Sequence, residues 1–422
     1  MNKFAHMADV HLGAHREPAL QKLELAAFGK SMEKCIELHV DFVLICGDLF
    51  HVGIPDLGVV NTALAKMIEV GKAGIPIYAI YGSHDYTPTG TSVIDILSTA
   101  GVLINLSRWR IEGPKLKLEV VEDQKTGAKL TGISARKIGL ESKYYEMLDR
   151  RKLEELDGFK IFAFHSGITE FRPAHLREME TVGLSSFPKG FDYYAGGHIH
   201  ERGEFEAPGY PRVVFPGPLF TGYGRDIEDT ARGEKRGFYV VEFDRKLRKT
   251  EFVHLETFDG VYREYDVNGK NSLEVSKEIR AELEGTEVRD RVVVIRVHGE
   301  LAGGRVADVD FAGLKGMLVG RGALHVYLNR YSLTSKESSA SLVVGADVGA
   351  IERKLFESEI SKVKVSATPL SGATGASTAQ ELLRVLRQPA KTNESKKDYR
   401  HRVVNDGADT LQLSDILKEK KR

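Results

Sequence analysis

Five apolar runs in the first half of this 422-residue chain each end directly in acidic residues or histidines, and this recurrence constrains the fold more than any other feature. Short runs rich in β-branched and aromatic residues are typical of buried strands. Apolar residues at helical spacing over 20–38, 59–70 and 92–97 predict helices between them, and hence alternating βα units. The five expected strands are 3–8, 42–46, 75–81, 159–164 and 191–195.

The polar residues that follow these strands are candidate metal ligands. In an open α/β sheet the carboxyl ends of the strands meet along one edge, and ligands bind in the crevice there. We therefore expect the five motifs to converge on one site. They are Asp9-Val10-His11, Gly47-Asp48, Gly82-Ser83-His84-Asp85, His165 and Gly196-Gly197-His198-Ile199-His200.

The spacing within two of the motifs favours a pair of metal ions. In extended backbone, residues i and i+2 point to the same side, so Asp9 and His11 would present their donors to one face. His198 and His200 have the same spacing. Such a pair lies roughly 6–7 Å apart at the backbone, which suits two ions about 3.5–4 Å apart better than one ion. The carboxylate of Asp48 is suited to bridge them. Nitrogen and oxygen donors without thiolate favour Mn²⁺, with Fe²⁺ or Mg²⁺ as alternatives, over structural zinc.

Each motif taken alone has an ordinary explanation. Asp-x-His is common at strand ends, and Gly-Asp is usual turn chemistry. Two histidines flanked by glycines, as in 196–200, are harder to explain as core packing. All five motifs in order, each after an expected strand, favour a functional site.

The whole series resembles the calcineurin-like metallophosphoesterases. The segments HMADVHLG at 6–13, CGDLFH at 46–51 and YGSHD at 81–85 are similar to one branch, the DNA double-strand-break repair nucleases called SbcD in bacteria and meiotic recombination eleven in archaea and eukaryotes. The specific motifs cover residues 1 to about 240, and the remainder is similar only in architecture. The resemblance implies an α/β fold with a two-sheet sandwich flanked by helices, a small α/β capping domain and a linker-tethered helical tail.

The resemblance also implies a ligand set for each ion. The expected ligands of the first ion are Asp9, His11, Asp48 and His200. Those of the second ion are Asp48, Ser83, His165 and His198. The family usually has Asn where this chain has Ser83, and because a hydroxyl reaches less far than an amide, the second ion is expected to be held more weakly.

Three further residues receive catalytic roles from the resemblance. His84 would contact the scissile phosphate and either stabilise the transition state or protonate the leaving oxygen. Asp85 would orient His84 by hydrogen bonding, and His51 would have an auxiliary role on the substrate side. The nucleophile would be a water activated by two Mn²⁺ ions per subunit, since paired ions lower the pKa of the water and clamp the attacking and leaving oxygens.

The activity implied is that of a Mn²⁺-dependent nuclease with 3′→5′ exonuclease activity on double-stranded DNA and endonuclease activity on single strands. The implied partners are DNA ends, an SMC-like coiled-coil ATPase of the SbcC type, and a second copy of the chain, bound through helices near 59–70 and 92–100. Two alternatives remain open. One is a small-molecule phosphodiesterase or phosphoprotein phosphatase with the same site, and the other is a catalytically weak DNA-end scaffold, which Ser83 motivates.

Four regions are expected along the chain. Residues 1–257 would form the nuclease domain. Residues 258–335 alternate strand-like and helix-like segments and would form a capping domain that contacts DNA or merely adds stability. Residues 336–379 would be an extension and a Ser-, Gly-, Ala- and Thr-rich flexible linker. Residues 380–422 would be a helical tail that docks on the ATPase or folds back on this chain. Its apolar faces contain Leu382, Leu383, Leu386, Leu413 and Leu417.

Overall composition does not indicate a nucleic-acid binder. The 60 basic and 60 acidic residues give a net charge of zero, so the DNA expectation rests on the resemblance. No apolar run approaches the roughly 20 residues of a membrane span, and the first residues already read as a strand. Cys35 and Cys46 offer no disulfide framework. The expected location is cytoplasmic, associated with the nucleoid and not with a membrane.

Overall fold

The computed structural model describes residues 1–87, 90–135, 141–339, 349, 352–353, 355–357, 360, 369–370, 372–391 and 394–414. Contacts divide the chain into two compact units. The first contains Met1–Tyr265, Ile279–Val297 and Phe311–Tyr331, and the second contains Asp266–Glu278, His298–Asp310 and Ser332–Arg422. Because these units cut through elements of the expected capping domain, the boundaries at 257, 335 and 379 stay predictions.

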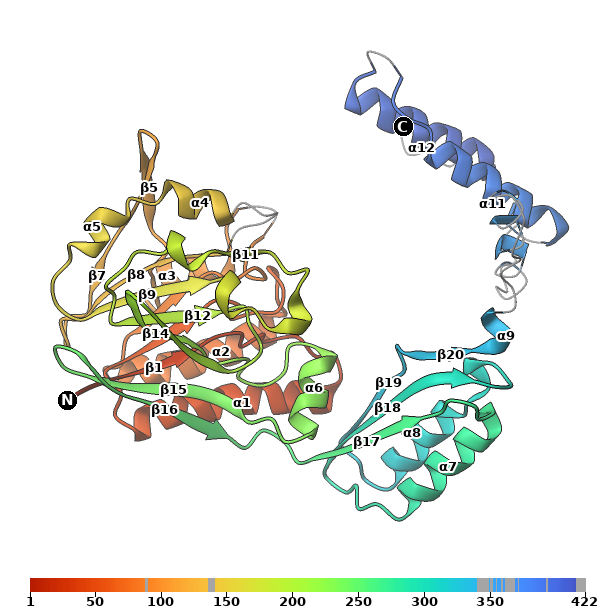
Figure 1. The fold of residues 1–422 in the computed structure, drawn as a ribbon, viewed down its shortest axis with the longest axis horizontal. Helices are drawn as coiled ribbons and strands as arrows, with labels where there is room; N and C mark the ends of the chain where they lie inside the picture. The colour runs from red at the N-terminus through yellow and green to blue at the C-terminus, as the bar shows by residue number, and fades with distance from the viewer. Residues whose placement is uncertain are drawn as a thin grey trace. The chain divides into compact units, whose positions relative to one another are not determined.

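Two six-stranded sheets form the centre of the first unit (Figure 1). The strands of the first sheet, in spatial order, are β16 Leu247–Leu255, β15 Arg236–Phe243, β1 Asn2–Met7, β2 Phe42–Cys46, β3 Ile77–Ile80 and β4 Ile104–Asn105. Those of the second are β13 Gly203–Ala207, β14 Tyr210–Phe215, β12 Tyr193–Gly197, β9 Lys160–His165, β8 Lys129–Ile133 and β7 Val121–Glu122. Two short pairs accompany them, β5 Trp109–Glu112 with β6 Lys115–Leu118 and β10 Gly167–Ile168 with β11 Thr181–Val182.

Strand β2 shows why the chain forms a sandwich. Phe42, Leu44 and Cys46 belong to the core that both sheets share. The alternate residues Val43 and Ile45 pack on the opposite face, in the core made with the helices. A strand that is covered on both faces must be apolar throughout, and all five residues of β2 are buried.

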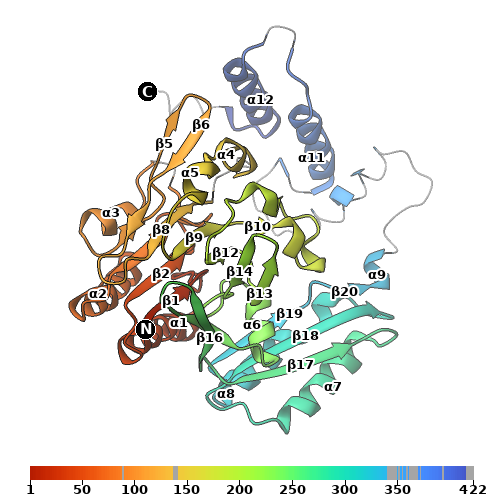
Figure 2. The ribbon, with the colours of Figure 1, turned by 60° about the vertical axis from the view of Figure 1, so that its left-hand side comes forward.

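Helices cover the outer faces of both sheets. Figure 2 shows α1 and α2 on the side of the first sheet that faces away from the second. Two of the helix starts have side-chain caps, because Asp56 accepts hydrogen bonds from the first turn of α2 and Ser92 forms a capping box with Asp95 in α3. Outside the capping region, the described α-helices of this unit are α1 Pro18–Glu37, α2 Leu57–Lys72, α3 Val93–Thr99, α4 Glu141–Met147, α5 Arg150–Glu154 and α6 Gly224–Ala231.

The parallel strands bring the five motifs to one edge. Strands β1, β2 and β3 are parallel, as are β8, β9, β12 and β14, so the carboxyl ends of β1, β2, β3, β9 and β12 lie together. The five expected strands and the two-sheet α/β fold are therefore confirmed. Their ends differ by up to two residues, because local pairing and not hydrophobicity alone decides where a strand stops.

The capping region has the α/β pattern that its sequence indicates. Strand β18 pairs in parallel with β19 and, at its end, with β20. Within the first unit, Glu228 of α6 accepts hydrogen bonds from Arg296 of β18, at 3.2 Å, and from Asn329 of β19. The elements are β17 Gly260–Asp266, α7 Ser272–Glu284, β18 Val292–Leu301, α8 Phe311–Gly320, β19 His325–Asn329 and β20 Leu333–Ser335.

Within the described part of the second unit, helices after β20 include α9 Lys336–Ser339, α11 Gly372–Leu386 and α12 Lys396–Thr410. Residues 372–379, expected as linker, form the first half of α11. Alanine favours helix, and the hydroxyls of Ser377 and Thr378 bond within the helix to the carbonyl of Thr374. Helix α12 lies in the polar segment before Leu413, and Leu417 lies outside the described residues. Among the helices that the structure describes, none is long and apolar enough to cross a membrane.

Candidate metal centre

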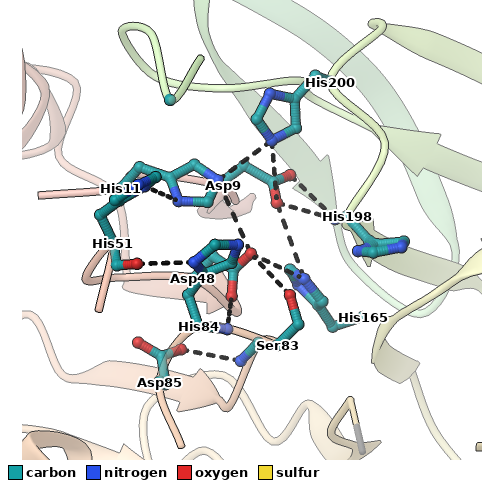
Figure 3. Close-up of polar contacts among 12 residues, drawn as sticks. Asp9, His11, Asp48, His51, Ser83, His84, Asp85, His165, His198 and His200 are labelled. Carbon is teal, nitrogen blue, oxygen red and sulfur yellow. Dashed lines mark hydrogen bonds and ion pairs between the residues drawn. The ribbon is translucent and has the colours of Figure 1, made fainter. Parts of the chain in front are cut away.

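The ten residues singled out from the sequence lie together at the shared edge of the two sheets (Figure 3). From the first sheet come the residues that follow β1, β2 and β3, and from the second come His165 at the end of β9 and the two histidines after β12. The residues are Asp9, His11, Asp48, His51, Ser83, His84, Asp85, His165, His198 and His200. Their convergence is a finding, whereas their roles as ligands or catalytic groups stay predictions.

The backbone of the ligand segments differs from the expected extended form. Asp9 and His11 have φ of 51°, Asp48 has φ of 50° and His198 has φ of 85°, all in the left-handed region. Asp9 and His11 therefore present their side chains from a turn beyond the end of β1. That turn is held by backbone hydrogen bonds from Asp9 N to Gly47 O, at 3.1 Å, and from His11 N to Asp48 O, at 2.8 Å. Asp and His tolerate this conformation better than most residues, but alternation along a strand does not predict it.

Two buried carboxylates form the middle of the centre. The carboxylate of Asp9 accepts the backbone N–H of His198 at 2.9 and 3.0 Å, and burial raises its pKa to about 6. Asp48 accepts the backbone N–H of His84 at 2.8 Å and the Ser83 hydroxyl at 3.4 Å. Burial disfavours its charge, but nearby His165 more than offsets this and holds the pKa of Asp48 well below its ordinary value. Asp48 is therefore an anion at neutral pH.

Outer hydrogen bonds set the ring orientation of two histidines. His165 Nδ1 lies 2.8 Å from Cys46 O, and since a carbonyl only accepts, Nδ1 carries the proton. His165 Nε2 then faces the Asp48 carboxylate at 3.2 Å and that of Asp9 at 3.9 Å. His200 Nδ1 donates to the carboxylate of Asp226 at 2.9 Å, which turns His200 Nε2 into the centre. In histidines that bind a metal through one ring nitrogen, the other ring nitrogen usually donates a hydrogen bond of this kind to a carbonyl or a carboxylate.

The centre favours a positive charge, and its donors fit a divalent cation. Buried His165 Nε2 has no hydrogen-bond partner, and His11 Nε2 faces His200 Nε2 at 3.1 Å, so two imidazole nitrogens point at each other. Burial would lower the pKa of His165, yet Asp48 and Asp9 raise it to about 10. A metal ion would take the place of that proton.

Three groups of donors within the described residues have the spacing of metal ligands at this edge: Asp9 with His11 and His200, Asp9 with Asp48 and His165, and His11 with His51 and His84. The geometry thus places Asp9 in both groups that contain a carboxylate, whereas the resemblance places Asp48 in the ligand sets of both ions. The bridging role of Asp48 stays a prediction. His198, whose pKa burial lowers to about 4, lies beside His165 with ring centroids 5.2 Å apart.

His84 lies at the outer side of the centre and is oriented by the backbone of His51. His84 Nδ1 lies 2.6 Å from the carbonyl oxygen of His51 and so donates to it, and the two rings stack with centroids 5.0 Å apart. His51 Nδ1 lies 3.4 Å from His11 Nδ1. The Asp85 carboxylate instead accepts the backbone N–H groups of Phe50 and Gly82, at 3.1 and 2.8 Å. The expectation that Asp85 orients the His84 ring by a direct hydrogen bond is therefore wrong, because that carboxylate holds the two loops together.

Sequence reasoning missed two residues of the centre, Tyr223 and Asp226, which lie at the start of α6. Asp226 binds His200, and the Tyr223 hydroxyl lies 2.7 Å from His84 Nε2. Neither follows a strand directly. The sequence signal that could have found them is the Gly222-Tyr223-Gly224 segment, because glycine lets the backbone approach another side chain closely. In the structure a Cβ at Gly222 would lie only 2.6 Å from His11 Cδ2.

A pocket of about 390 Å³ opens the centre to solvent. Its wall combines the polar groups of the centre with the apolar side chains of Leu176 and Met179, from the loop between β10 and β11. Among the lining residues are Asp48, Ser83, His84, His198, His200 and Tyr223. A substrate that enters here meets His84 and the carboxylates together.

Residues 2–202, which include all ten predicted site residues, match the family model of the calcineurin-like phosphoesterases. The DNA double-strand break repair protein Mre11 of Archaeoglobus fulgidus is 29% identical over 73% of this chain and 74% of its own length. The Mre11 proteins of Methanococcus maripaludis and Methanopyrus kandleri are 31% and 29% identical over 47% and 60% of this chain, and 52% and 57% of their own lengths.

Two solved structures show weaker similarity. An archaeal phosphodiesterase aligns with a TM-score of 0.30 and 16% identity, over 60% of this chain and 99% of that chain. A dimetal phosphatase from Danio rerio aligns with a TM-score of 0.37 and 9% identity, over 60% and 97%. These scores are too low to carry an argument. Residues 2–202 are thus a calcineurin-like phosphoesterase domain, and the chain as a whole is similar to the archaeal Mre11 proteins.

Proposed function

We propose that the protein is a divalent-metal-dependent nuclease that hydrolyses phosphodiester bonds at DNA ends during double-strand-break repair, and that it works at the nucleoid. The observation that carries the proposal is the cluster of two buried carboxylates and four histidines, His11, His165, His198 and His200, beside an open pocket. The substrate class comes from the relatives, which are named as DNA double-strand break repair proteins.

Two Mn²⁺ ions are proposed as the cofactor, with Mg²⁺ or Fe²⁺ as alternatives. Asp9, His11, Asp48 and His200 would hold one ion. Asp48, Ser83, His165 and His198 would hold the other. Two of the donor groups with ligand spacing, Asp9 with His11 and His200 and Asp9 with Asp48 and His165, support this assignment. When bound, such ions lower the pKa of a water molecule and stabilise charge on the phosphate oxygens. The Ser83 hydroxyl lies 3.4 Å from the Asp48 carboxylate, so it reaches the centre. Its side chain is shorter than that of the Asn usual in the family.

His84 is proposed to act on the leaving oxygen. Its Nδ1 is fixed by the His51 carbonyl, and its Nε2 faces the pocket. The attacking water first gives up a proton to bulk solvent. As the resulting hydroxide oxygen forms a bond to phosphorus, the bond from phosphorus to the leaving sugar oxygen breaks, and that oxygen takes the proton from Nε2 of the doubly protonated His84 ring. A positioned acid of this kind contributes about 10²-fold or more to the rate. His51 keeps the His84 and His11 rings in place.

The tail is proposed to dock on a coiled-coil ATPase. Helices α11 and α12 pack together, and Leu382, Leu383 and Leu386 line an apolar hollow of about 330 Å³ with Phe356 and Ile360. Leu386 is 54% exposed. An amphipathic helix that joins an apolar partner groove would cover such side chains.

A homodimer through α2 and α3 is proposed on the apolar surface of these helices. Leu57 is 81% exposed and Ile96 is 60% exposed, although large apolar side chains are usually covered. Ile54, just before α2, is 73% exposed. A second copy of the chain would bury them.

The decisive experiment is a nuclease assay on the full chain with linear double-stranded and circular single-stranded DNA, in Mn²⁺, Mg²⁺ or EDTA. We expect Mn²⁺-dependent release of nucleotides from 3′ ends and nicking of the circles. Asp48→Ala should abolish both activities and His84→Ala should lower both about 10²-fold, whereas Asp244→Ala, on an exposed turn, serves as the matched control. Full activity of a folded Asp48→Ala variant, or equal cleavage in EDTA, would contradict the proposal.

A further inference from the structure

The aromatic ring of Tyr223 stands among four histidines of the centre. The centroid of its ring lies 5.2 Å from that of His200, 5.6 Å from His11, 5.7 Å from His51 and 6.1 Å from His84. The side chain also lines the pocket, and the residue is 46% exposed. Tyr223 is therefore the part of the centre that an incoming substrate meets early.

The backbone of Tyr223 is fixed independently of its side chain. Its N–H and that of Gly222 both donate to the Asp226 carboxylate, at 2.9 and 2.8 Å. Gly222 lies so close to His11 that it has no room for a Cβ. Gly224 is enclosed on its other side, because a Cβ there would meet the Tyr327 hydroxyl of β19. The Tyr223 ring therefore starts from a turn whose backbone is fixed on both sides. The position of the turn brings the Tyr223 hydroxyl to His84.

The hydroxyl of Tyr223 meets the one ring nitrogen of His84 that faces the pocket. His84 Nδ1 is already committed as a donor to the His51 carbonyl, which leaves Nε2, and the Tyr223 hydroxyl lies 2.7 Å from it. A hydroxyl can donate to a neutral imidazole nitrogen and accept from a protonated one. The contact is therefore compatible with His84 before and after it transfers a proton.

We infer that Tyr223 is a positioning residue for His84, which it holds with Nε2 directed at the scissile phosphate. The inference rests on the proposed nuclease function and adds to it a residue that the family motifs do not contain. The hydroxyl of Tyr223 is the group that positions His84, because it makes the hydrogen bond to Nε2. If Tyr223 only packed against the histidines, phenylalanine would serve equally well.

A double-mutant cycle tests whether Tyr223 acts through His84. Tyr223→Phe should lower kcat on linear DNA about tenfold, the rate equivalent of one net hydrogen bond, and leave KM and the Mn²⁺ requirement unchanged. In the His84→Ala background the same change should alter kcat less than about twofold, because the group that it positions is already absent. Tyr331→Phe removes a hydroxyl from a residue that is 93% exposed and is the matched control. Equal losses in both backgrounds, or no loss in either, would overturn the inference.

A second readout uses the metal-free protein and needs no activity. Nitrogen NMR of protein labelled at histidine should show His84 with its proton on Nδ1, and Tyr223→Phe should shift the Nε2 resonance while Tyr331→Phe leaves it in place. An unchanged Nε2 resonance in Tyr223→Phe would overturn the inference. If the wild-type chain cleaves no DNA in Mn²⁺, the proposed function fails, and the NMR comparison alone then decides whether Tyr223 holds His84.

Discussion

Replacing Asp226 by Asn should weaken metal binding at the centre about 10–100-fold, although Asp226 is not itself an expected ligand. Its Oδ2 accepts three hydrogen bonds, from Gly222 N, Tyr223 N and His200 Nδ1. Burial disfavours its charge, but the contact with His200 more than offsets this and lowers the pKa of Asp226 to about 2, so the carboxylate is ionised at working pH.

The magnitude follows from what the amide can and cannot replace. The three donors converge on one oxygen, so the Asn oxygen in that place can still accept all three hydrogen bonds and the backbone turn is kept. The amide is neutral, however, so His200 loses the charge-assisted hydrogen bond that holds its proton on Nδ1 and turns Nε2 into the centre. A hydrogen bond to a charged group is worth about 1.5–3 kcal/mol. This range corresponds to about 10–150-fold in metal affinity. It agrees with the loss seen at other metal sites when a residue that hydrogen-bonds to a metal ligand is replaced.

Calorimetric titration of metal-free protein with Mn²⁺ measures the effect. Asp229→Asn is the matched control, because Asp229 lies on the same helix, its carboxylate is more exposed, and it forms an ion pair with Arg225 at 3.5 Å and not a contact with His200 in the described part of the chain. Circular dichroism and the melting temperature, compared with those of the wild type, check that the variant is folded and that helix α6 still begins at Gly224. Wild-type affinity in a folded Asp226→Asn variant would refute the reasoning, because His200 would then either not bind metal or not depend on Asp226 for its tautomer.

Three further predictions follow from single contacts. Ser83→Asn should lower the Mn²⁺ concentration for half-maximal nuclease rate, since an amide oxygen is a better hard-cation donor than a hydroxyl; an unchanged or higher requirement in the same titration would place Ser83 away from the ion. Burial raises the pKa of Glu24 from an ordinary 4.5 to about 7 even though its carboxylate accepts the N–H groups of Gly13 and Ala14, so its protonated form is favoured by folding. Its contribution to stability is present below the unfolded-state pKa and is lost as pH rises through 7, and urea unfolding should show the wild type losing about 2–3 kcal/mol between pH 4.5 and 8 relative to Glu24→Gln; parallel pH curves for the two proteins would contradict this. Deleting residues after Thr368 should leave Mn²⁺-dependent cleavage nearly unchanged and abolish co-purification with the ATPase, and retained binding by the truncated chain would remove the docking role of the tail.

The sequence predicts where the centre lies better than how it is built. Asp48 and His165 are foreseeable because each follows an apolar run, and parallel strands must end at a common edge. The left-handed turn at Asp9 is not foreseeable, since it depends on hydrogen bonds to the neighbouring loop after β2. Asp226 lies on a helix well past the end of β14, and only the tertiary fold brings it to His200. Local patterns therefore locate the ligands, and long-range contacts orient them.

The left-handed backbone at Asp9, His11 and Asp48 lowers the stability of the metal-free fold, so a larger part of the thermal stability depends on occupancy of the metal centre. A residue other than glycine in this conformation costs on the order of 1 kcal/mol, and the two buried carboxylates add charge that disfavours the metal-free fold. A cation that binds only the folded chain stabilises it by about 2.7 kcal/mol at a hundred times its Kd. The melting temperature should therefore rise with Mn²⁺ concentration even in the His84→Ala variant, so loading of the centre can be followed in a protein whose turnover is strongly reduced.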